Sequence, residues 1–436
     1  MQTNTTESRK LGTSVAVIDG ARTGFTRIGT KQKYLSAIDL GVRPVNALCE
    51  RYGLGTKTDG LLIFGTVIQH TEVSNLAREI ALVSKLHPMT RCFSTVKACA
   101  TSLNATAEAA AWIANGSVPW ALVGGSESMS NFPVHFSKRV GATLRDFKFS
   151  RSTGEKLSAL MGLRPADLLP QVPGVTELST GLSMGQHCEI MLRDWSIPRE
   201  EQDQWAAQSH HAAAAAAQWN EKFIIHETDN LVRADTSAEK LAKLKPVFPL
   251  PPHLIEKYPG AGTLTAGNSS PLTDGGACVL LADEAYARKQ RWPILAIIDD
   301  FEAAAVDIKS EGLLMAPPYA ILRLLDRKGL QLTDFDMVEI HEAFAGQVLC
   351  NLKAITDSKW AQSRVGLPAT TLPSRDRLNP KGGSVSVGHP FGATGARLVM
   401  QLARSMQESK AKRGLISICA AGGLGLVGTL RSSERS

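Results

Sequence analysis

The stretch that decides the fold lies near the end of the chain and reads Gly388-His389-Pro390-Phe391-Gly392-Ala393-Thr394-Gly395. A second run follows further along the chain and reads Cys419-Ala420-Ala421-Gly422-Gly423. Each run sets a reactive side chain among small residues, which let a backbone and a bulky ligand approach closely. Because a reactive thiol needs a base or a positive environment to form its thiolate, this pairing indicates thioester chemistry.

Length and composition place the chain among ordinary globular proteins. Its 436 residues are 43% hydrophobic and 20% charged, and the formal net charge is +7. No run of roughly eighteen uncharged apolar residues occurs, so we expect no membrane-spanning helix. The segment Met1–Lys10 is polar and lacks the apolar core of a secretory signal, and Ser433–Ser436 matches no peroxisomal signal. These features predict a cytoplasmic location.

The cysteines indicate free thiols in a reducing compartment. Their number is odd and the chain is long, which argues against a disulfide framework. Neither a CxxC pair nor an HExxH sequence occurs, so we expect no metal site. The mild positive charge favours an anionic small molecule, an acidic partner or a membrane surface, and no block of like charges indicates nucleic-acid binding. The seven cysteines are Cys49, Cys92, Cys99, Cys188, Cys278, Cys350 and Cys419.

Strand and helix patterns alternate in the first and last parts of the chain, which predicts an α/β fold. The basic segment 132–173 shows no clear period, and we expect Gly124-Gly125 to end the strand before it. The expected strands are 14–19, 61–65, 94–96, 121–123, 277–281, 294–298, 337–340 and 415–418. The expected helices are 75–84, 101–114, 198–217, 319–328 and 396–405.

The chain carries a weak internal echo. Cys99 is followed by a helix, a strand and Gly124-Gly125, and His389 is followed by a helix, a strand and Gly422-Gly423. In both places a chemically capable residue lies where a loop enters a helix. The echo predicts two related halves with an inserted middle segment.

Four residues could perform chemistry, and each has a plainer interpretation. Cys99 precedes a helix whose N-terminus would lower the thiol pKa and offer donors to an oxyanion, although a lone cysteine there is commonly buried and inert. His389 could take the thiol proton, or it could be a loop histidine satisfied locally. Cys419 could be a second reactive thiol or a core cysteine at a strand end. His341 follows a strand and could simply precede a helix start.

Two familiar patterns do not fit their usual structural context. The run Gly423–Gly428 matches GxGxxG, but only eight residues follow it, so no dinucleotide-binding βαβ unit can form. The run Ser94–Lys97 matches SxxK, but no SDN or KTG accompanies it, which argues against a serine acyl-enzyme.

Eight short blocks, taken together and in order, resemble the thiolase family over about residues 14 to 430. Each block alone carries little weight, whereas chance agreement of the whole ordered set is improbable. The blocks are Ala21–Thr23, Cys99–Ser102, Gly124–Ser130, Met184–Glu189, Thr265–Gly275, His341–Phe344, Gly388–Pro390 and Cys419–Gly423.

The resemblance implies a duplicated five-layer αβαβα thiolase fold with an inserted loop domain. In this chain the N-terminal half would comprise residues 1–130 together with 255–290, and it would carry the nucleophile. Residues 131–254 would form the inserted loop domain that binds CoA and the acyl chain. Residues 291–436 would form the C-terminal half.

The resemblance also implies an activity, the cleavage of a 3-ketoacyl-CoA by CoA through a cysteine acyl-enzyme. Cys99 would be the nucleophile, His389 its activator and Cys419 the second acid and base, while a water near His341 would help to bind the thioester oxygen. The backbone N–H groups of Cys99 and Ala421 would hold the other oxyanion, although many members have glycine at the latter position. CoA is then a substrate and no cofactor or metal is needed. The residues implied in substrate and CoA binding are Ser270, Met184 and Phe344.

Two features narrow the class. The family often has asparagine at the position of His341, and histidine there, together with the long basic middle segment, resembles the β-subunits of fatty-acid β-oxidation complexes. Ser183 stands where acetoacetyl-specific members tend to carry histidine, which favours longer acyl chains. The implied partners are a second copy of the chain, as a homodimer or a dimer of dimers, and a hydratase/dehydrogenase α-subunit. The aromatic residues of the basic segment, Phe136, Phe147 and Phe149, could line an acyl tunnel, dock a partner subunit or make peripheral membrane contact, or they could belong to an ordinary packed loop.

Three alternatives stay open. The first is an acetoacetyl-CoA thiolase that works in the condensing, biosynthetic direction. The second is a decarboxylating or acyl-carrier condensing enzyme on the same fold, but such enzymes use one cysteine with two histidines and lack the block around Cys419. The third is a non-catalytic lipid-binding or scaffold subunit, which would be expected to have lost part of the catalytic set.

Overall fold

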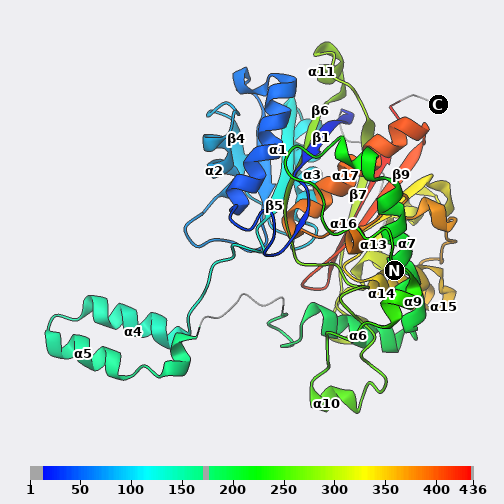
Figure 1. The fold of residues 1–436 in the computed structure, drawn as a ribbon. Coiled ribbons are helices and arrows are strands. Elements are labelled where there is room, and N and C mark those ends of the chain that lie inside the picture. The colour runs from blue at the N-terminus through cyan, green and yellow to red at the C-terminus, as the bar shows by residue number, and fades with distance from the viewer. Residues whose placement is uncertain (1–12, 170–175, 434–436) are drawn as a thin grey trace, which may run out of the picture.

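The computed structural model describes residues 13–169 and 176–433 (Figure 1). Two segments used to predict the location of the protein, Met1–Lys10 and residues 434–436, lie outside the described residues. The end of the basic segment, residues 170–173, also lies outside them. In the described part of the chain, no helix is long and apolar enough to cross a membrane.

Ten strands in the described residues form a connected sheet system in the order β4-β3-β5-β6-β1-β7-β10-β9-β8, with β2 paired to β6 beside this path. The first half of the path holds the parallel neighbours β4, β3 and β5, and the second half holds the parallel pair β8 and β9. The two halves join where β1 and β7 pair antiparallel. The strands are β1 (Val15–Arg22), β2 (Thr26–Arg27), β3 (Leu61–Gly65), β4 (Arg91–Phe93), β5 (Trp120–Glu127), β6 (Thr273–Asp283), β7 (Ala296–Ala305), β8 (Met337–Ile340), β9 (Arg413–Ala420) and β10 (Leu424–Arg431).

The helices cover and separate the two halves of this sheet system (Figure 1). Seven of the α-helices in the described residues, α4 to α10, lie in the long excursion between β5 and β6. The α-helices are α1 (Ala37–Tyr52), α2 (Leu76–Val83), α3 (Thr101–Ala114), α4 (Lys138–Phe149), α5 (Thr153–Met161), α6 (Met184–Asp194), α7 (Arg199–Ala215), α8 (Ala217–Glu221), α9 (Ala238–Ala242), α10 (Pro252–Ile255), α11 (Glu284–Lys289), α12 (Ile308–Glu311), α13 (Ala316–Lys328), α14 (Ala345–Thr356), α15 (Ser358–Trp360), α16 (Ser384–Val387) and α17 (Thr394–Ser409).

Alternate residues of the strands divide between a central core and two outer cores. On β1, Val15 and Val17 enter the central core, whereas Ala16 and Ile18 pack with α1 and α2 in an outer core. On the other side, Ile416 of β9 faces the central core and its neighbour Leu415 packs with α13 and α14. Because side chains alternate across a strand, each half of the sheet has helices on both faces. The layers run helix, sheet, helix, sheet, helix, which confirms the expected α/β duplicated fold.

The central layer consists of α3 and α17, which pack against each other and contact strands of both halves. The two helices lie very close together where they cross, because a Cβ atom added at Gly395 of α17 would lie 2.2 Å from the backbone nitrogen of Leu103 in α3. Only glycine fits at that crossing. Each of these helices begins just after one of the predicted reactive residues, Cys99 or His389, so the echo in the sequence corresponds to equivalent places in the two halves.

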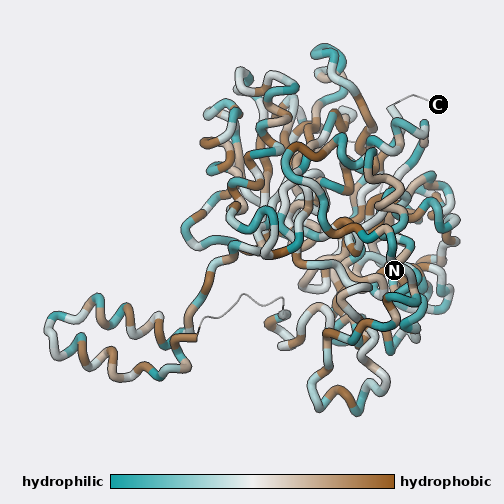
Figure 2. Tube along the Cα trace, in the orientation of Figure 1, coloured by the Kyte–Doolittle hydropathy of each residue, from teal (hydrophilic) through white to brown (hydrophobic). Residues whose placement is uncertain are grey.

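The chain leaves the sheet at Glu127 and returns to it at Thr273, between the antiparallel neighbours β5 and β6. Within this excursion α4 and α5 form a hairpin that projects from the body (Figure 1). The interpretation of 132–173 as lacking regular structure was therefore wrong. The period is obscured because α5 buries no residue and both helices carry exposed apolar side chains. Figure 2 marks the hydrophobic residues along the hairpin in brown.

Two strand predictions need correction. The strand expected at 94–96 lies at Arg91–Phe93, because residues 94–97 already belong to the turn that leads to Cys99. Gly124-Gly125 do not end β5, which continues to Glu127. A Cβ added at Gly125 would lie 2.0 Å from the carbonyl oxygen of Gly392, so glycine here makes room for a neighbouring loop and does not break the strand. The helix expected at 101–114 and the strand expected at 337–340 are confirmed.

Candidate active site

Cys99 lies in a tight turn immediately before α3. The preceding residue, Ala98, has a positive φ of 46°, a backbone conformation that residues other than glycine rarely adopt. Thr101 holds this turn in place: its Oγ1 accepts the N–H of Lys97 at 2.9 Å and donates to the carbonyl of Ala98 at 2.7 Å. The sequence thus presents the thiol on a constrained turn at the start of a central helix.

Two backbone N–H groups point at the sulfur of Cys99. One is its own, and the other belongs to Ala421, in the turn between β9 and β10. These are the two groups that the family resemblance implies as an oxyanion hole, and they come from opposite halves of the fold. Alanine in place of the family's more frequent glycine does not keep this N–H from the sulfur.

The expected lowering of the Cys99 pKa was wrong. Burial of the sulfur is the main cause that raises the pKa of Cys99 to about 12. The two N–H groups lower the pKa by less than burial raises it, and the negative charge of Glu127 contributes a smaller rise. Desolvation penalises the charged thiolate more than the helix terminus and the two donors stabilise it. At neutral pH the resting site therefore holds a thiol.

The two histidines meet beside Cys99. His341 directly follows β8, and its N–H donates to the carbonyl of Ser417 at 2.8 Å, which extends the pairing with β9. His389 follows α16 and Gly388, whose φ is 107°, and its N–H donates to Oγ1 of Thr273 at 3.1 Å. The ring centroids are 4.1 Å apart. One ring nitrogen of each histidine and the sulfur of Cys99 all lie within 4.8 Å of one another.

Both imidazoles are neutral at pH 7. Burial, followed by the positive charge of Arg397, lowers the pKa of His341 to about 3. Burial also lowers the pKa of His389 well below its ordinary value, and the charges of His341 and Arg397 lower it further. A neutral imidazole can accept a proton, so either ring could act as a base toward the thiol.

Cys419 is buried near the end of β9, opposite Gly425 of β10. Burial raises its pKa well above the ordinary value, and the charge of a Cys99 thiolate would raise it further. The second thiol is therefore protonated in the resting site and electrostatically coupled to the first. A protonated thiol of this kind can donate a proton to a carbanion.

An apolar group surrounds Cys419 and includes two of the three predicted binding residues. Phe344 is buried in the same cluster as Cys419, and Met184 packs against that cluster. Phe248 meets Phe344 edge to face, with ring centroids 5.6 Å apart. Ser270, the third predicted residue, is tied to this region because its N–H donates to the carbonyl of Ala343 at 2.9 Å. The structure thus gathers all the predicted residues around one site.

Two models of known protein families match the chain, and together they cover almost all of it. A family model described as "Thiolase, N-terminal domain" matches residues 15–285, and a model described as "Thiolase, C-terminal domain" matches residues 292–431. The chain belongs to the thiolase family.

Similar proteins agree with this assignment along almost the whole chain. The chain is 39% identical to a "3-ketoacyl-CoA thiolase" of Pseudoalteromonas translucida, with 97% of this chain and 98% of that protein covered. It is also 39% identical to a "3-ketoacyl-CoA thiolase" of Colwellia psychrerythraea, with 95% and 96% covered. The crystal structure of human mitochondrial 3-ketoacyl-CoA thiolase has a TM-score of 0.77 at 25% identity, with 97% of this chain and 100% of that chain covered. The crystal structure of the Bacillus anthracis acetyl-CoA acetyltransferase also has a TM-score of 0.77, at 26% identity, with 96% and 98% covered.

Buried carboxylates in three of the thiolase blocks hold the site loops in place. Glu127 accepts hydrogen bonds from Thr66, from two further N–H groups and from the N–H of Gly392, which lies three residues after His389. Glu189 accepts three N–H groups of the loop that leads to Ser270. Glu342 accepts from Trp205, Ser209, Asn379 and the N–H of Val385.

Sequence reasoning missed the residues that contact the far side of the two histidines. Thr394 contacts Nδ1 of His389 at 2.6 Å, and Ser384 contacts Nδ1 of His341 at 2.9 Å. Arg397 in turn contacts Ser384 at 3.1 Å. Thr394 stands in the opening stretch of the sequence, five residues after His389, so its position was a usable signal. Ser384 lies equally close to His389 in the chain, but it contacts His341, 43 residues away, so its position gives no signal of that contact. The position of Arg397 gives no such signal either.

Cys99, His341 and His389 also offer three soft metal-ligand atoms. These three atoms all lie within 4.8 Å of one another. The absence of a metal requirement stays a prediction from the sequence.

Proposed function

We propose that this thiolase cleaves 3-ketoacyl-CoA with CoA, giving acetyl-CoA and an acyl-CoA two carbons shorter, in fatty-acid β-oxidation. The observation that carries the proposal is the convergence of a protonated Cys99, two neutral histidines and the N–H of Ala421 within one buried site. Relatives that cover nearly the whole chain bear the name 3-ketoacyl-CoA thiolase, which supports the choice of substrate.

In the first half of the reaction the sulfur of Cys99 bonds to the 3-keto carbon while its proton passes to His389. The resulting alkoxide is held by the N–H groups of Cys99 and Ala421. A donor of this kind typically contributes about 3 kcal/mol to transition-state stabilisation. Collapse of the alkoxide breaks the bond between carbons 2 and 3, and the enolate of acetyl-CoA leaves. Cys419 donates its proton to carbon 2, while His389 and a water near His341 bind the thioester oxygen.

In the second half, the thiolate of Cys419 removes the proton of incoming CoA. The CoA sulfur attacks the acyl group on Cys99, and the departing Cys99 thiolate recovers its proton from His389. All three protein groups return to their starting protonation, so the cycle is ping-pong and needs no cofactor. CoA is a substrate throughout.

Replacing the two thiols separately tests this assignment. Cys99→Ser should abolish thiolysis of 3-ketohexadecanoyl-CoA, followed as loss of the enolate absorbance after CoA is added. Cys419→Ser should sharply slow deuterium exchange at the α-carbon of acetyl-CoA. Cys92→Ser serves as the matched control. Turnover near the wild-type rate in Cys99→Ser, or unchanged exchange in Cys419→Ser, would refute the respective role.

A second candidate is an acetoacetyl-CoA thiolase working in the condensing direction, and the likeness to an acetyl-CoA acetyltransferase structure favours keeping it. In the sequence analysis, serine at position 183 favours longer acyl chains. In the structure the Ser183 hydroxyl caps α6, so the capping of this helix also accounts for a serine here. A series of kcat/KM values for thiolysis from C4 to C16 substrates separates the two. Rising values with chain length support β-oxidation, and activity confined to C4 supports the second candidate.

We also propose that the chain forms a homodimer, or a dimer of dimers, across the edge strand β4. This strand has three residues and lies at the end of the sheet path, which leaves one edge without a partner in the described residues. Val96 and Trp112 are exposed nearby, and a hollow of about 300 Å³ lined by Ser94 and Val96 adjoins them. Light scattering should give a dimer mass, and Val96→Asp should lower it. A monomer in the wild type would contradict the proposal.

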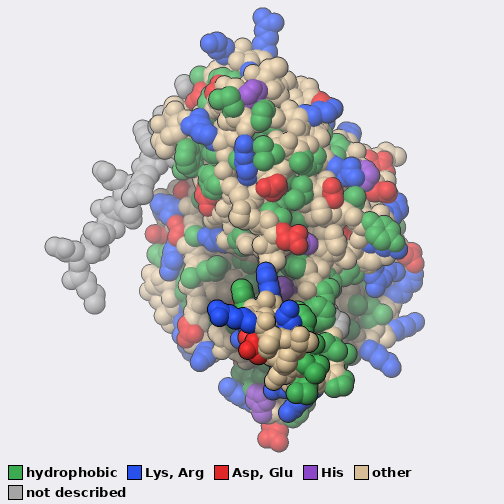
Figure 3. Space-filling model, turned by 90° about the vertical axis from the view of Figure 1, so that its left-hand side faces the viewer, with side chains coloured by type: hydrophobic (Ala, Val, Ile, Leu, Met, Phe, Trp, Pro, Cys, Tyr) green, Lys and Arg blue, Asp and Glu red, His purple; other side chains and the backbone are tan. Residues whose placement is uncertain are grey.

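The α4–α5 hairpin supports a peripheral contact with an anionic membrane surface. Phe136, Phe149 and Met161 are exposed, and Lys138, Arg145, Lys148 and Lys156 lie on the same two helices or beside them. In Figure 3, where the hairpin points toward the viewer, basic and hydrophobic side chains gather on it together. Apolar residues next to basic ones bind anionic lipid surfaces.

Sedimentation with vesicles of phosphatidylglycerol and phosphatidylcholine tests the membrane contact. The wild type should sediment with these vesicles and not with pure phosphatidylcholine, and Phe149→Ser with Met161→Ser should reduce binding at least fivefold. Ile255→Ser, at another exposed site, is the control. If instead a hydratase/dehydrogenase α-subunit co-purifies and protects the hairpin from protease, the hairpin serves that partner.

The remaining sequence predictions become part of this proposal. Residues 1–130 with 255–290, 131–254 and 291–436 are the proposed N-terminal half, loop domain and C-terminal half. Ser270, Met184 and Phe344 are the proposed contacts of the CoA and acyl groups. The cysteines are all free, which supports a reducing compartment, and we propose the cytoplasm.

A further inference from the structure

Two buried ring nitrogens face the site without a hydrogen-bond partner. They are Nε2 of His341 and Nε2 of His389. Both side chains are almost fully buried, and the rings stand 4.1 Å apart at 45°. Since each neutral imidazole carries one hydrogen on one of two nitrogens, the function of each Nε2 depends on what the opposite nitrogen contacts.

The contacts of Thr394 determine where the hydrogen of His389 lies. Its Oγ1 lies 2.6 Å from Nδ1 of His389 and donates to the carbonyl of Pro390 at 3.1 Å. A hydroxyl has one hydrogen, and the carbonyl can only accept. Thr394 therefore accepts from His389, which places the hydrogen on Nδ1 and leaves Nε2 as a bare lone pair that can take the proton of Cys99.

The contacts of Ser384 give the opposite result for His341. Its Oγ lies 2.9 Å from Nδ1 of His341 and 3.1 Å from Nη2 of Arg397. A guanidinium only donates, so Ser384 accepts from Arg397. In the described residues Ser384 Oγ has no other hydrogen-bond partner, and its own hydrogen goes to Nδ1 of His341. The hydrogen of His341 then lies on Nε2.

The alternative arrangement of His341 would be unfavourable on two counts. With its hydrogen on Nδ1, Ser384 would accept two hydrogen bonds and its own hydrogen would be left buried without an acceptor. The bare Nε2 of His341 would also face the bare Nε2 of His389, and two lone pairs repel. When His341 and His389 adopt opposite tautomers, Ser384 has a partner for its own hydrogen, and the two lone pairs do not face each other.

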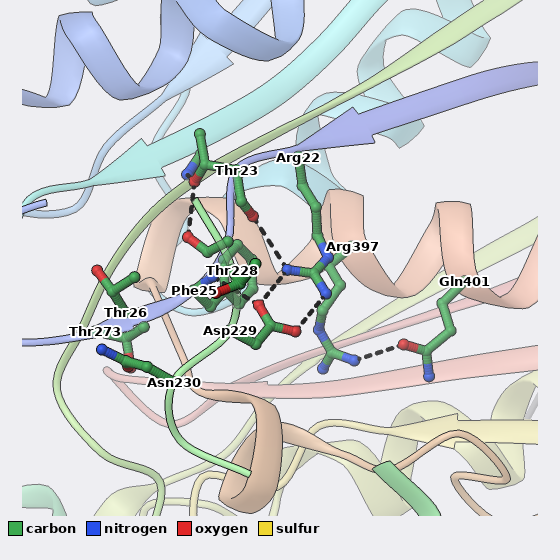
Figure 4. A network of polar contacts seen from close by, with 12 residues as sticks. Arg22, Thr23, Phe25, Thr26, Thr228, Asp229, Asn230, Thr273, Arg397 and Gln401 are labelled. Atoms are coloured by element: carbon green, nitrogen blue, oxygen red, sulfur yellow. Dashed lines mark hydrogen bonds and ion pairs between the residues drawn. The ribbon is translucent and has the colours of Figure 1, made fainter. Parts of the chain in front are cut away.

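Arg397 is held so that it donates to Ser384. It lies on α17, is 1% exposed and donates through Nη1 to Gln401 at 3.0 Å. Gln401 donates in turn to both oxygens of Glu339 at 3.0 Å. Figure 4 shows the guanidinium of Arg397 beside that of Arg22, which is paired with Asp229. No carboxylate lies within ion-pair distance of Arg397 in the described residues, so its N–H groups stay available for the neutral partners.

We infer that Ser384 and Arg397 are positioning residues, which hold the hydrogen of His341 on Nε2 and so give the two histidines opposite functions. The inference rests on the proposed function for its catalytic meaning. His389 presents an acceptor for the Cys99 proton, while His341 presents a permanent donor to the water or oxygen that develops charge. No proton needs to move between the two rings during a turnover.

Nitrogen-15 magnetic resonance of histidine-labelled protein reads the tautomers directly, because protonated and bare ring nitrogens of a neutral imidazole have well separated shifts. We expect the hydrogen on Nε2 for His341 and on Nδ1 for His389, with signals assigned by their loss in His341→Asn and His389→Asn. Ser384→Ala should give His341 a mixture of both forms and leave His389 unchanged. The same tautomer for both residues in the wild type, or no change in Ser384→Ala, would overturn the inference. This reading needs no substrate, so it is independent of whether the proposed function holds.

A double-mutant cycle, measured by enzyme kinetics, provides a second test. Ser384→Ala should lower kcat for thiolysis about tenfold or more with KM changed less than threefold. In a His341→Asn background, where the amide has no tautomers, the same substitution should change kcat less than threefold. Equal losses in both backgrounds would mean that Ser384 acts independently of His341, and would overturn the inference. Unfolding temperatures of all four proteins show whether any variant is merely misfolded, and the wild-type resonance pattern then still decides the question.

Discussion

At the scale of single residues, the reactive groups are stored in their uncharged forms. The pKa of Cys99 is raised to about 12, and the pKa values of His341 and His389 are lowered, in each case chiefly by burial. Charge therefore develops only when substrate occupies the site, where the two N–H groups on Cys99 can stabilise it. The sequence predicts a set of reactive residues, and that assignment stays a prediction. Their protonation could not be predicted from the sequence, because desolvation depends on the atoms that surround each group.

Alkylation measures the thiol pKa directly. A thiol with a raised pKa remains protonated over the accessible range, so the thiolate fraction increases about tenfold per pH unit. The iodoacetamide rate at Cys99, followed by mass spectrometry, should increase steadily from pH 7 to pH 10 without a plateau. Cys99→Ala removes the signal and identifies it. A plateau near pH 7 would indicate a resting thiolate and contradict this prediction.

Acid should destabilise the protein through the same histidines. A group whose folded pKa is depressed contributes stability above its unfolded pKa, near 6.5, and loses it as pH falls. For His341, with a folded pKa of about 3, the loss between pH 7.5 and 5.5 is about 1.4 kcal/mol. Urea unfolding at both pH values should show a loss smaller by about this amount in His341→Asn than in the wild type. Equal losses in both proteins would show that this histidine is not buried in its neutral form.

At the scale of elements, the loops of the site depend on buried carboxylates. Glu127 connects β5 to the loop after β3 and to the Gly392 loop, and it accepts four hydrogen bonds in doing so. Because Gly392 lies three residues after His389, a weakened contact here should displace the histidine and not only loosen the fold.

The variant Glu127→Gln tests that contact. An amide nitrogen facing N–H donors removes acceptors from the buried site, which should cost about 2 kcal/mol of unfolding free energy. We also expect kcat for thiolysis to fall at least tenfold, because His389 shifts relative to Cys99. Glu79→Gln on the exposed face of α2 is the matched control. A loss of stability with an unchanged kcat would show that the hydrogen bonds of Glu127 stabilise the fold but do not position His389.

The elements that the sequence predicted best are those whose pattern follows from burial. The helix at 101–114 was predicted with correct bounds because one face packs in the central layer and its start adjoins Cys99. Gly124-Gly125 were misread because a glycine that makes room for a distant loop looks the same in sequence as one that ends a strand. The hairpin was missed because its apolar residues stay exposed, so no buried face imposes a regular period.

At the scale of the whole molecule, the α4–α5 hairpin projects from the body and buries few residues (Figure 1). The helix α5 buries no residue, and α4 buries only Val140 and Thr143. Replacing residues 136–168 by a short Gly-Ser linker should therefore cost less than about 1 kcal/mol of stability. We expect kcat/KM for a C4 substrate within about twofold of the wild type, and loss of vesicle binding. Loss of C4 activity, with the fold intact by circular dichroism, would show that the hairpin belongs to the active site.

The central pair α3 and α17 explains why the site needs the entire chain. Cys99 and the N–H of Ala421 that points at it lie at opposite ends of the sequence, and they meet only after both halves have packed on these helices. A chain still emerging from the ribosome exposes the nucleophile long before its base and its second donor have been synthesised. In such a nascent chain the thiol of Cys99 still lacks the histidine base and the second backbone donor that surround it in the folded protein.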